Sequence, residues 1–373
     1  MRILIATGIY PPETGGPATF VPALAADWSS HGWDITVVTY GDAQTKRASG
    51  WKVEVVARTG GPIARYLRYL NRVRVLAKEV DMVFLQGPFS DGLPGTIGAM
   101  LAGRPTMLRV PGDFAWEGMQ REQAAATQSL ETFLAAAKPL KWRCIFWLES
   151  LIARRARAVV TPSHYLQKLA TAWGVAEARK HVVYNTVELD LNLPSRAELR
   201  AQFGFEEDQT ILLSNARGVP WKRVDFLLEV LHELPETYRL VHVGEGPEIV
   251  HWKQLAIDLG VASRVEFLGR VPYLKVQQLA RASDAFLLPS LYEGFPHVAV
   301  EAACHGLPCF LSDQGGNPEA GSQYPERIRI LPYANKDAWR QALEQIPPVF
   351  EPIPPQPFAE VANAYAAVLK DAC

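Results

Sequence analysis

The stretch PSLYEGFPHVAVEAACHGLPCFLSDQGGNPE, residues Pro289–Glu319, decides the fold of this chain. It places Glu293 in a loop and Glu301 eight positions later, inside a helix predicted to open near Phe295–Pro296. A proline is tolerated in the first helical turn because its missing N–H would be unpaired there. The free amides and the positive dipole end of such a helix favour an anion such as a phosphate. Two carboxylates, which accept hydrogen bonds from diols, therefore bracket one predicted phosphate site.

That layout suits a ligand with diols at both ends and a diphosphate between them, as in a sugar nucleotide. The alternative is that Glu293 only caps the helix and Glu301 is a solvated surface residue. The sequence motifs around the pair resemble, over about thirty residues in fixed order, the donor-site signature of the retaining glycosyltransferases of family 4. The residues that carry the resemblance are Glu293-Gly294-Phe295-Pro296, Glu301-Ala302, Gly306-Leu307-Pro308 and Gly315-Gly316-Asn317-Pro318-Glu319.

The composition is that of an ordinary globular chain long enough for two domains. It has 373 residues, 48% hydrophobic and 21% charged, with a formal net charge of −1 that gives no support for a nucleic-acid partner. The four cysteines, Cys144, Cys304, Cys309 and Cys373, lack metal-site spacing and fit reduced thiols in the cytosol. No apolar run reaches the roughly 18 residues of a membrane span, so a cytoplasmic location is expected.

The N-terminal half alternates short apolar runs with helical segments. The runs are Arg2–Thr7, Val53–Ala57, Met82–Gln86, Thr106–Val110, Ala158–Thr161 and Val182–Tyr184. Such alternation is typical of a parallel sheet covered by helices on both faces, so this half is predicted to be one Rossmann-like domain.

Gly15 and Gly16 follow the first run and precede a helix. Glycines at such a turn let the backbone approach a phosphate, which a Cβ would prevent. The loop is neither a GxGxxG fingerprint nor a Walker loop, so an NAD or ATP site is not predicted. In the family that the chain resembles, this loop faces the donor phosphates, and the alternative is a plain loop.

Two segments of the N-terminal half combine basic with aromatic and aliphatic residues. Residues Ile63–Val80 carry Arg65, Arg68, Arg72 and Arg74, and residues Lys138–Arg157 carry Lys141, Arg143, Arg154 and Arg155. Basic amphipathic helices can lie on an anionic membrane surface. The alternative is helices that pack one face on the sheet and leave their arginines solvated.

Asp113 follows the run Thr106–Val110, at the end of a strand where open α/β sheets build ligand sites. Many members of the resembled family have a His-Asp pair in this loop. Here Gly112 stands where the histidine would be, so a catalytic histidine is not transferred. Asp113 is a candidate for orienting an acceptor hydroxyl or stabilising charge, and the alternative is a turn-capping aspartate.

The second half restarts with a strand at Thr210–Ser214 and a loop that carries Arg217 and Lys222. Both can point at one anion, arginine as a planar fork and lysine as a point charge. The loop resembles the phosphate clamp of family 4, and the alternative is two ordinary solvated cations. The domain boundary is expected near residues 186–195.

Further elements are assigned by resemblance. The nucleobase slot is expected at Phe267, Leu268, Gly269 and Val271, formed largely by backbone groups. The proline-rich stretch Pro347–Pro357 is expected to be extended, and the helix Phe358–Leu369 to pack back onto the first domain. The expected domains are residues 1–190, with the helix of 358–373, and residues 191–350.

The resemblance implies the GT-B architecture, in which two Rossmann-like domains with parallel sheets face each other across a cleft. It implies a hexosyl or other glycosyltransferase that moves a sugar from a nucleotide-sugar donor to a saccharide or lipid-linked acceptor with retention of configuration, as in cell-surface polysaccharide biosynthesis. Glu293 would bind the donor sugar with the loop amides of Phe295, Pro296 and His297 nearby, and Glu301 would bind the ribose. Arg217, Lys222 and Glu293, with Asp113, are the expected catalytic residues.

Charge develops on the leaving diphosphate, and cations and helix amides can stabilise it. No Asp-x-Asp motif appears in a suitable loop, so no metal or other cofactor is expected. If the acceptor is lipid-linked, peripheral contact with the inner face of the plasma membrane is expected. Two alternatives stay open: an inactive sugar-nucleotide-binding protein, and a nucleotide-sugar epimerase or hydrolase of the same architecture.

Overall fold

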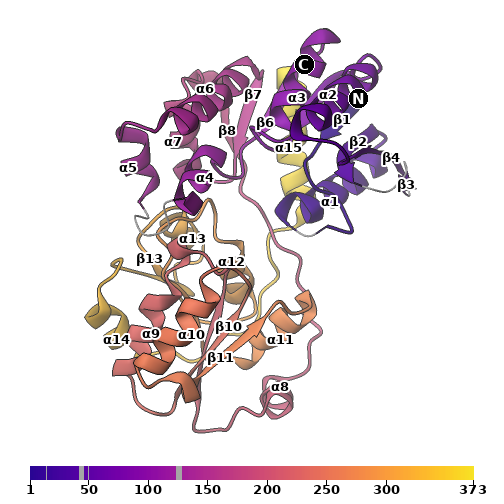
Figure 1. The fold of residues 1–373 in the computed structure, drawn as a ribbon. Helices are drawn as coiled ribbons and strands as arrows, with labels where there is room; N and C mark the ends of the chain where they lie inside the picture. The colour runs from indigo at the N-terminus through magenta and orange to yellow at the C-terminus, as the bar shows by residue number, and fades with distance from the viewer. Residues whose placement is uncertain (14, 42–45, 49, 123–127) are drawn as a thin grey trace. The chain divides into compact units, whose positions relative to one another are not determined.

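The computed structural model describes residues 1–13, 15–41, 46–48, 50–122 and 128–373, and the chain divides into two compact units (Figure 1). The first unit contains Met1–Met119, Phe133–Tyr184 and Phe358–Cys373. The second contains Gln120–Thr132 and Asn185–Pro357. The C-terminal residues therefore belong to the same unit as the N-terminus.

The first unit is built on a sheet with the strand order β3-β4-β2-β1-β5-β6-β7-β8. Neighbouring strands run parallel except β3, which pairs antiparallel with β4. The strands are β1 (Arg2–Ala6), β2 (Asp34–Gly41), β3 (Lys46–Ala48), β4 (Trp51–Ala57), β5 (Met82–Leu85), β6 (Thr106–Arg109), β7 (Ala158–Thr161) and β8 (Lys180–Val182).

Most of the apolar runs of this half are strands, as expected. The run predicted at 182–184 is an exception, because β8 ends at Val182. Strand β2 was not predicted, since Thr36 and Thr39 interrupt its apolar residues. The helices between the strands are α1 (Gly16–Ser30), α2 (Pro62–Ala77), α3 (Gly92–Leu101), α4 (Phe114–Glu122), α5 (Leu130–Ala135), α6 (Leu140–Arg155) and α7 (His164–Ala172).

Helix α15 (Phe358–Ala372) completes the core of the first unit. Tyr365 is fully buried, and its ring lies 5.3 Å from that of Phe20 and 5.7 Å from that of Phe84. The indole N–H of Trp28 donates to the Ala362 carbonyl at 3.1 Å. The apolar residues whose spacing predicted this helix thus lie on the face that the sheet and α1 cover.

The second unit has a six-stranded sheet in the order β11-β10-β9-β12-β13-β14, in which every paired neighbour runs parallel. The reversal of strand order lies between β9 and β12. The strands are β9 (Thr210–Asn215), β10 (Tyr238–Val243), β11 (Val265–Gly269), β12 (Ala285–Leu288), β13 (Cys309–Ser312) and β14 (Ile328–Leu331).

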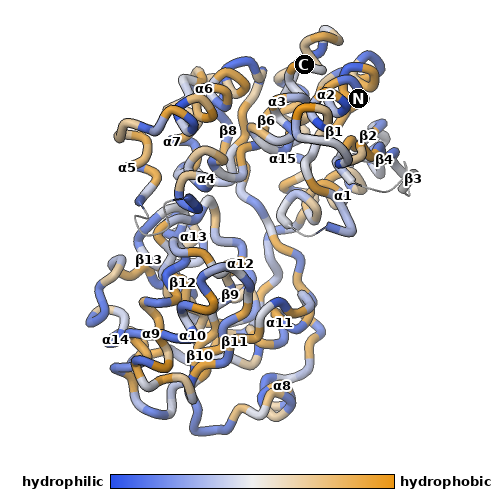
Figure 2. Tube along the Cα trace, in the orientation of Figure 1, coloured by the Kyte–Doolittle hydropathy of each residue, from blue (hydrophilic) through white to orange (hydrophobic). Residues whose placement is uncertain are grey.

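The helices of the second unit cover this sheet and bury a second core around Trp252, Phe310 and Trp339. They are α8 (Arg196–Phe203), α9 (Val224–Glu233), α10 (Ile249–Asp258), α11 (Tyr273–Ala282), α12 (His297–Cys304), α13 (Asn317–Gln323) and α14 (Lys336–Leu343). Hydrophobic and hydrophilic residues are interspersed along the trace (Figure 2). Within the described part of the chain, no helix has both the length and the hydropathy that spanning a bilayer requires.

Candidate functional site

Two loops leave the sheet of the second unit at its carboxyl edge, one after β9 and one after β12. These strands are parallel neighbours, so the loops emerge side by side. The amide of Leu291, in the second loop, donates to the carbonyl of Trp221, in the first, at 2.8 Å. The carboxyl edge at a reversal of strand order is where open α/β sheets bind ligands.

Lys222 and Glu293, one from each loop, form an ion pair through Lys222 Nζ and Glu293 Oε1. Glu293 is 8% exposed and Lys222 is partly buried. The pair joins two of the predicted site residues directly, although they lie 71 positions apart in the sequence. A cation and an acid are thereby held together at the ligand edge.

Gly315 and Gly316 support the Glu293 loop from the far side. The amide of Gly316 donates to the Glu293 carbonyl at 2.8 Å. A Cβ on Gly315, which has φ +66°, would lie 2.6 Å from the Glu293 amide nitrogen, and one on Gly316 would lie 2.6 Å from the Gly294 carbonyl oxygen. Any side chain at these two positions would thus clash with the backbone of the Glu293 loop, which explains the two glycines of the signature.

Arg217 lies on the same loop as Lys222 and is exposed. This loop packs closely on the turn after β10, and the amide of Gly218 donates to the Glu245 carbonyl at 2.8 Å. A Cβ on Gly244 or Gly246 would run into the backbone of Ala216 or Gly218. The lack of a side chain at these two glycines therefore lets the Arg217 loop approach, a role that the sequence analysis did not predict.

The segment Phe295–His297 leads into α12, which begins at His297 with Pro296 at its N-cap. Pro296 has no amide N–H, so the expectation of a loop amide from Pro296 is wrong on chemical grounds. The His297 amide donates to the Phe295 carbonyl at 3.0 Å. The Asn185 side-chain amide contacts His297 Nε2 at 3.0 Å.

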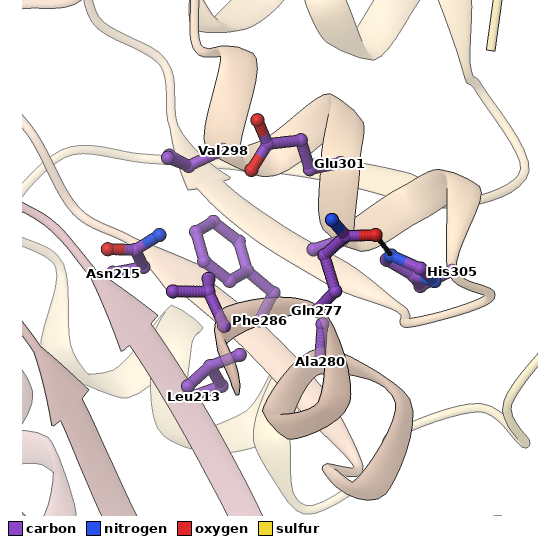
Figure 3. A pocket seen from close by; sticks show the side chains of 10 residues that line it. Leu213, Asn215, Gln277, Ala280, Phe286, Val298, Glu301 and His305 are labelled. Atoms are coloured by element: carbon purple, nitrogen blue, oxygen red, sulfur yellow. Dashed lines mark hydrogen bonds between the residues drawn. The ribbon is translucent and has the colours of Figure 1, made fainter. Parts of the chain in front are cut away.

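Glu301 lies one turn into α12 and borders a cavity of about 10 Å³, which is close to the space that one water molecule needs. Figure 3 shows Phe286 and Leu213 below Glu301, and beside them the hydrogen bond between His305 Nε2 and Gln277 Oε1, in which the histidine donates. Burial raises the pKa of Glu301 to about 7, and a hydrogen bond from Tyr273 partly offsets this rise. Glu301 is therefore partly protonated near neutral pH, which was not predicted from the sequence.

The residues of the predicted nucleobase slot lie on and just after the edge strand β11. Phe267, Leu268, Gly269 and Val271 are all partly buried. The Phe267 ring packs against His242 at 5.8 Å, and the Gly269 carbonyl accepts from the Gly244 amide at 2.9 Å. The Phe267 side chain is thus engaged in the core, which leaves backbone groups for any slot.

In the first unit, Gly15 and Asp113 lie in loops after β1 and β6, at the carboxyl edge of that sheet. Gly15 is the N-cap of α1, with φ +149°, and a Cβ there would lie 2.7 Å from Ile9 Cδ1. Gly16, the first residue of α1, is exposed and has open space where its Cβ would be.

Asp113 is fully buried, and its Oδ1 accepts the Trp116 amide at 2.9 Å. This is the capping role considered as the alternative. Glu149 of α6, also fully buried, accepts the Phe114 amide at 3.1 Å. Burial raises the pKa of Asp113 to about 7 and raises that of Glu149 well above its usual value, to which the neighbouring Asp113 adds. The sequence offered no signal for Glu149.

Among the described residues, no group of three histidine, cysteine, aspartate or glutamate side chains is arranged to hold a metal ion. The predicted site residues fall into two sets. Arg217, Lys222, Glu293, the start of α12, Glu301 and the slot belong to the second unit, and Gly15, Gly16 and Asp113 belong to the first.

Comparisons with known proteins agree with this division. Residues 15–186 match the family described as "Glycosyl transferase 4-like domain", and residues 195–346 match "Glycosyl transferases group 1". Over 205 residues the chain is 29% identical to D-inositol 3-phosphate glycosyltransferase of Mycobacteroides abscessus, covering 53% of this chain and 46% of that protein. The chain thus spans about half the length of the curated relatives it matches.

Solved structures resemble the whole chain. Sucrose-phosphate synthase from Thermosynechococcus elongatus superposes with a TM-score of 0.76 at 16% identity, covering 99% of this chain and 98% of that one. Anabaena HepE in complex with UDP-glucose gives 0.69 at 19% identity, covering 100% and 99%. These likenesses confirm the GT-B fold class. The two matches together span most of the chain, and it belongs to the glycosyl transferases group 1 family, with a glycosyl transferase 4-like N-terminal domain.

Proposed function

We propose that this protein is a retaining glycosyltransferase that uses a nucleotide-sugar donor without a metal ion. The bond between the anomeric carbon and the diphosphate oxygen breaks, and its electron pair leaves with the diphosphate. An acceptor hydroxyl bonds to the anomeric carbon from the side of the departing phosphate, and its proton passes to the released diphosphate. Family membership supports the reaction class.

The observation that carries this proposal is the ion pair of Lys222 and Glu293 at the carboxyl edge of the second sheet. Lys222, with Arg217 on the same loop, supplies positive charge for the leaving diphosphate. Glu293 lies beside it and supplies an acceptor for sugar hydroxyls. Glu301, inside α12, is assigned to the ribose, and Anabaena HepE was solved with UDP-glucose bound.

We place the acceptor at the first unit, where Gly15, Gly16 and Asp113 lie at the carboxyl edge of the sheet. The acceptor proposed is a saccharide or lipid-linked saccharide of cell-surface polysaccharide synthesis, reached at the inner face of the plasma membrane. Two observations favour a membrane contact. Leu140 and Trp147 of α6 are 66% and 56% exposed, and Lys141 and Arg143 beside them are exposed as well.

The test combines donor binding with transfer. UDP-, GDP- and ADP-glucose are first ranked by thermal shift, and the best donor is incubated with extracted lipid-linked saccharides and EDTA. We expect a new glycosidic product in the presence of the chelator. Lys222→Met should weaken donor binding by roughly tenfold or more, because a charge-assisted contact with the diphosphate is lost. It should also destabilise the fold by about 1–3 kcal/mol, since Glu293 stays buried without its cation.

The double variant Lys222→Met/Glu293→Gln separates these effects. It should recover most of the lost stability while donor binding stays weak. Lys336→Met, which removes a lysine paired only at the surface, is the matched control and should change neither. Donor affinity retained in the double variant would refute the site. Binding with neither transfer nor hydrolysis would instead show an inactive binding protein, and an epimerised or free sugar without a glycoside would show an epimerase or hydrolase.

A further inference from the structure

Tyr273 is the first residue of α11 and lies two positions after Val271 of the proposed slot. Its hydroxyl is 3.1 Å from Glu301 Oε1 and 2.8 Å from the carbonyl oxygen of Glu188. A phenol has one proton to donate, so two acceptors share it. The residue as a whole is 47% exposed. The hydroxyl is thus held by two acceptors, whereas much of the side chain is open to solvent.

Glu301 is surrounded by few titratable groups. Tyr273 of α11 faces Glu301, and Glu188 lies near Tyr273. Cys304 is on α12, the same helix as Glu301. His305 borders the same cavity, and burial lowers its pKa to about 4, so it is neutral near pH 7. Burial raises the pKa of the Tyr273 hydroxyl, which is therefore protonated throughout the physiological range. The Tyr273 hydroxyl is accordingly the group that donates to Glu301.

A ribose bound by Glu301 needs the same carboxylate. A diol presents two donors, and an ionised carboxylate accepts both. Oε1 already accepts the Tyr273 hydroxyl at 3.1 Å, so a ribose hydroxyl that uses the same lone pair must displace it. The open ring of Tyr273 can move away without uncovering a core, because it is half-exposed.

We propose that Tyr273 competes with the donor for Glu301: its hydroxyl holds the Glu301 carboxyl in the free protein, and the ribose diol of the nucleotide displaces it. This inference rests on the proposed function and assigns the exchange to the ribose end of that site. Tyr273 acts through Glu301 and does not touch the reacting atoms.

Displacement of Tyr273 by the ribose changes the protonation of Glu301. Free Glu301 is partly protonated at pH 7, since its pKa is raised to about 7. The bound carboxylate accepts two hydroxyls, which favours its ionised form. Binding therefore releases a fraction of a proton at pH 7 and almost none at pH 9, and affinity rises with pH up to about 7 and then levels off.

The experiment is titration calorimetry with the best-binding nucleotide sugar of UDP-, GDP- and ADP-glucose. These diesters have no phosphate that titrates near pH 7, so proton release reports on the protein. Measurements in buffers of different ionisation enthalpy give the number of protons. Glu301→Gln should abolish the release, because the amide does not titrate.

Tyr273→Phe keeps the ring and removes the hydroxyl. At pH 9 it should bind about fivefold more tightly, since the free protein no longer has a Tyr273 hydrogen bond to give up. At pH 7 it should release more protons than wild type, because the hydrogen bond that favours ionised Glu301 is gone. Tyr238→Phe, which removes a hydroxyl bonded to the Leu343 carbonyl in the same unit, is the matched control and should match wild type.

Equal affinity and equal proton release in wild type and Tyr273→Phe at both pH values would overturn this inference and leave the proposed function intact. Failure of all three nucleotide sugars to bind the wild-type protein would overturn the proposed function and the inference with it. A tighter Tyr273→Phe complex at pH 9 with an unchanged Tyr238→Phe control supports the exchange.

Discussion

Asp113 and Glu149 are two carboxyl groups buried together in the first unit. Each has one oxygen that accepts a backbone amide of the first turn of α4, Trp116 for Asp113 and Phe114 for Glu149, and the two carboxyls also share a side-chain hydrogen bond. The charged groups that face Asp113 are Glu149, Glu117 and Lys138. Burial therefore favours the protonated form of both carboxyls, which makes Asp113 and Glu149 a pair of titratable groups in the interior.

We expect the first unit to lose stability as the pH rises from about 4 to about 7. The unfolded carboxyls ionise near pH 4, whereas Asp113 keeps its proton to about pH 7 and Glu149 also has a raised pKa. The folded state thus binds more protons in this window, and stability falls by up to about 1.4 kcal/mol per pH unit for each proton retained. Denaturant unfolding at pH 5, 6, 7 and 8 measures the slope.

Glu149→Gln should flatten that slope and raise stability at pH 8, because it removes one of the two acids and leaves an oxygen for the Phe114 amide. Glu79→Gln, at an exposed position of the same unit, is the matched control and should keep the wild-type slope. A wild-type slope in Glu149→Gln would show that the pair does not titrate in this way.

At the scale of one element, α2 and α6 both leave apolar side chains exposed beside their cations, Ile63 and Leu67 on α2 and Leu140 and Trp147 on α6. On α2, Arg72 pairs with Glu54, and Arg65 lies over the Tyr40 ring at 5.4 Å. On α6, Leu140, Cys144 and Trp147 lie on one exposed line of the helix, four and then three positions apart. The two helices were equal candidates for a membrane contact, and we test α6 because its exposed line contains a tryptophan, whose amphipathic ring suits the membrane interface.

We predict that the protein binds vesicles containing phosphatidylglycerol more strongly than vesicles of phosphatidylcholine alone. Trp147→Ser should weaken this binding by roughly tenfold, because the indole supplies apolar area and an interfacial N–H. Binding should also fall with added salt, since part of it comes from the lysine and arginine charges of α6. Sedimentation with vesicles measures both effects.

Val250→Ser is the matched control, because Val250 is 79% exposed on α10 of the other unit. It should bind as wild type does. Equal binding to both kinds of vesicle, or Trp147→Ser that binds like Val250→Ser, would exclude α6 as the contact.

At the scale of the whole molecule, the two ends of the chain build one core. We expect Tyr365→Ala to destabilise the first unit by about 3–5 kcal/mol, because it opens a cavity between α15, Phe20 and Phe84. Tyr365→Phe should cost only about 1–2 kcal/mol, since it loses the hydrogen bond from Arg109 Nε at 3.1 Å and keeps the ring. Guanidinium unfolding measures both changes.

Ala367→Ser, at an exposed position of the same helix, is the control and should lie within about 0.5 kcal/mol of wild type. A Tyr365→Ala protein as stable as this control would mean that α15 is dispensable for the core of the first unit.

The sequence by itself determined the fold class and the family. Short β-rich runs between helical segments predict parallel sheets because a strand buried on both faces must be apolar along its whole length. The sequence motifs between Arg217 and Glu319, in their fixed order, then identify the family. Strand β2, whose apolar residues are interrupted by two threonines, and the start of β8 at Lys180 were not predicted, since pairing with neighbours, and not local composition, makes them strands.

The tertiary structure alone decided which residues meet. The pairing of Lys222 with Glu293, the hold of Tyr273 on Glu301 and the burial of Glu149 beside Asp113 join residues 28 to 71 positions apart. The tertiary structure also decided which carboxyls are protonated. The pKa of a carboxyl depends on how far its surroundings exclude water, and water is excluded only once distant segments have packed together.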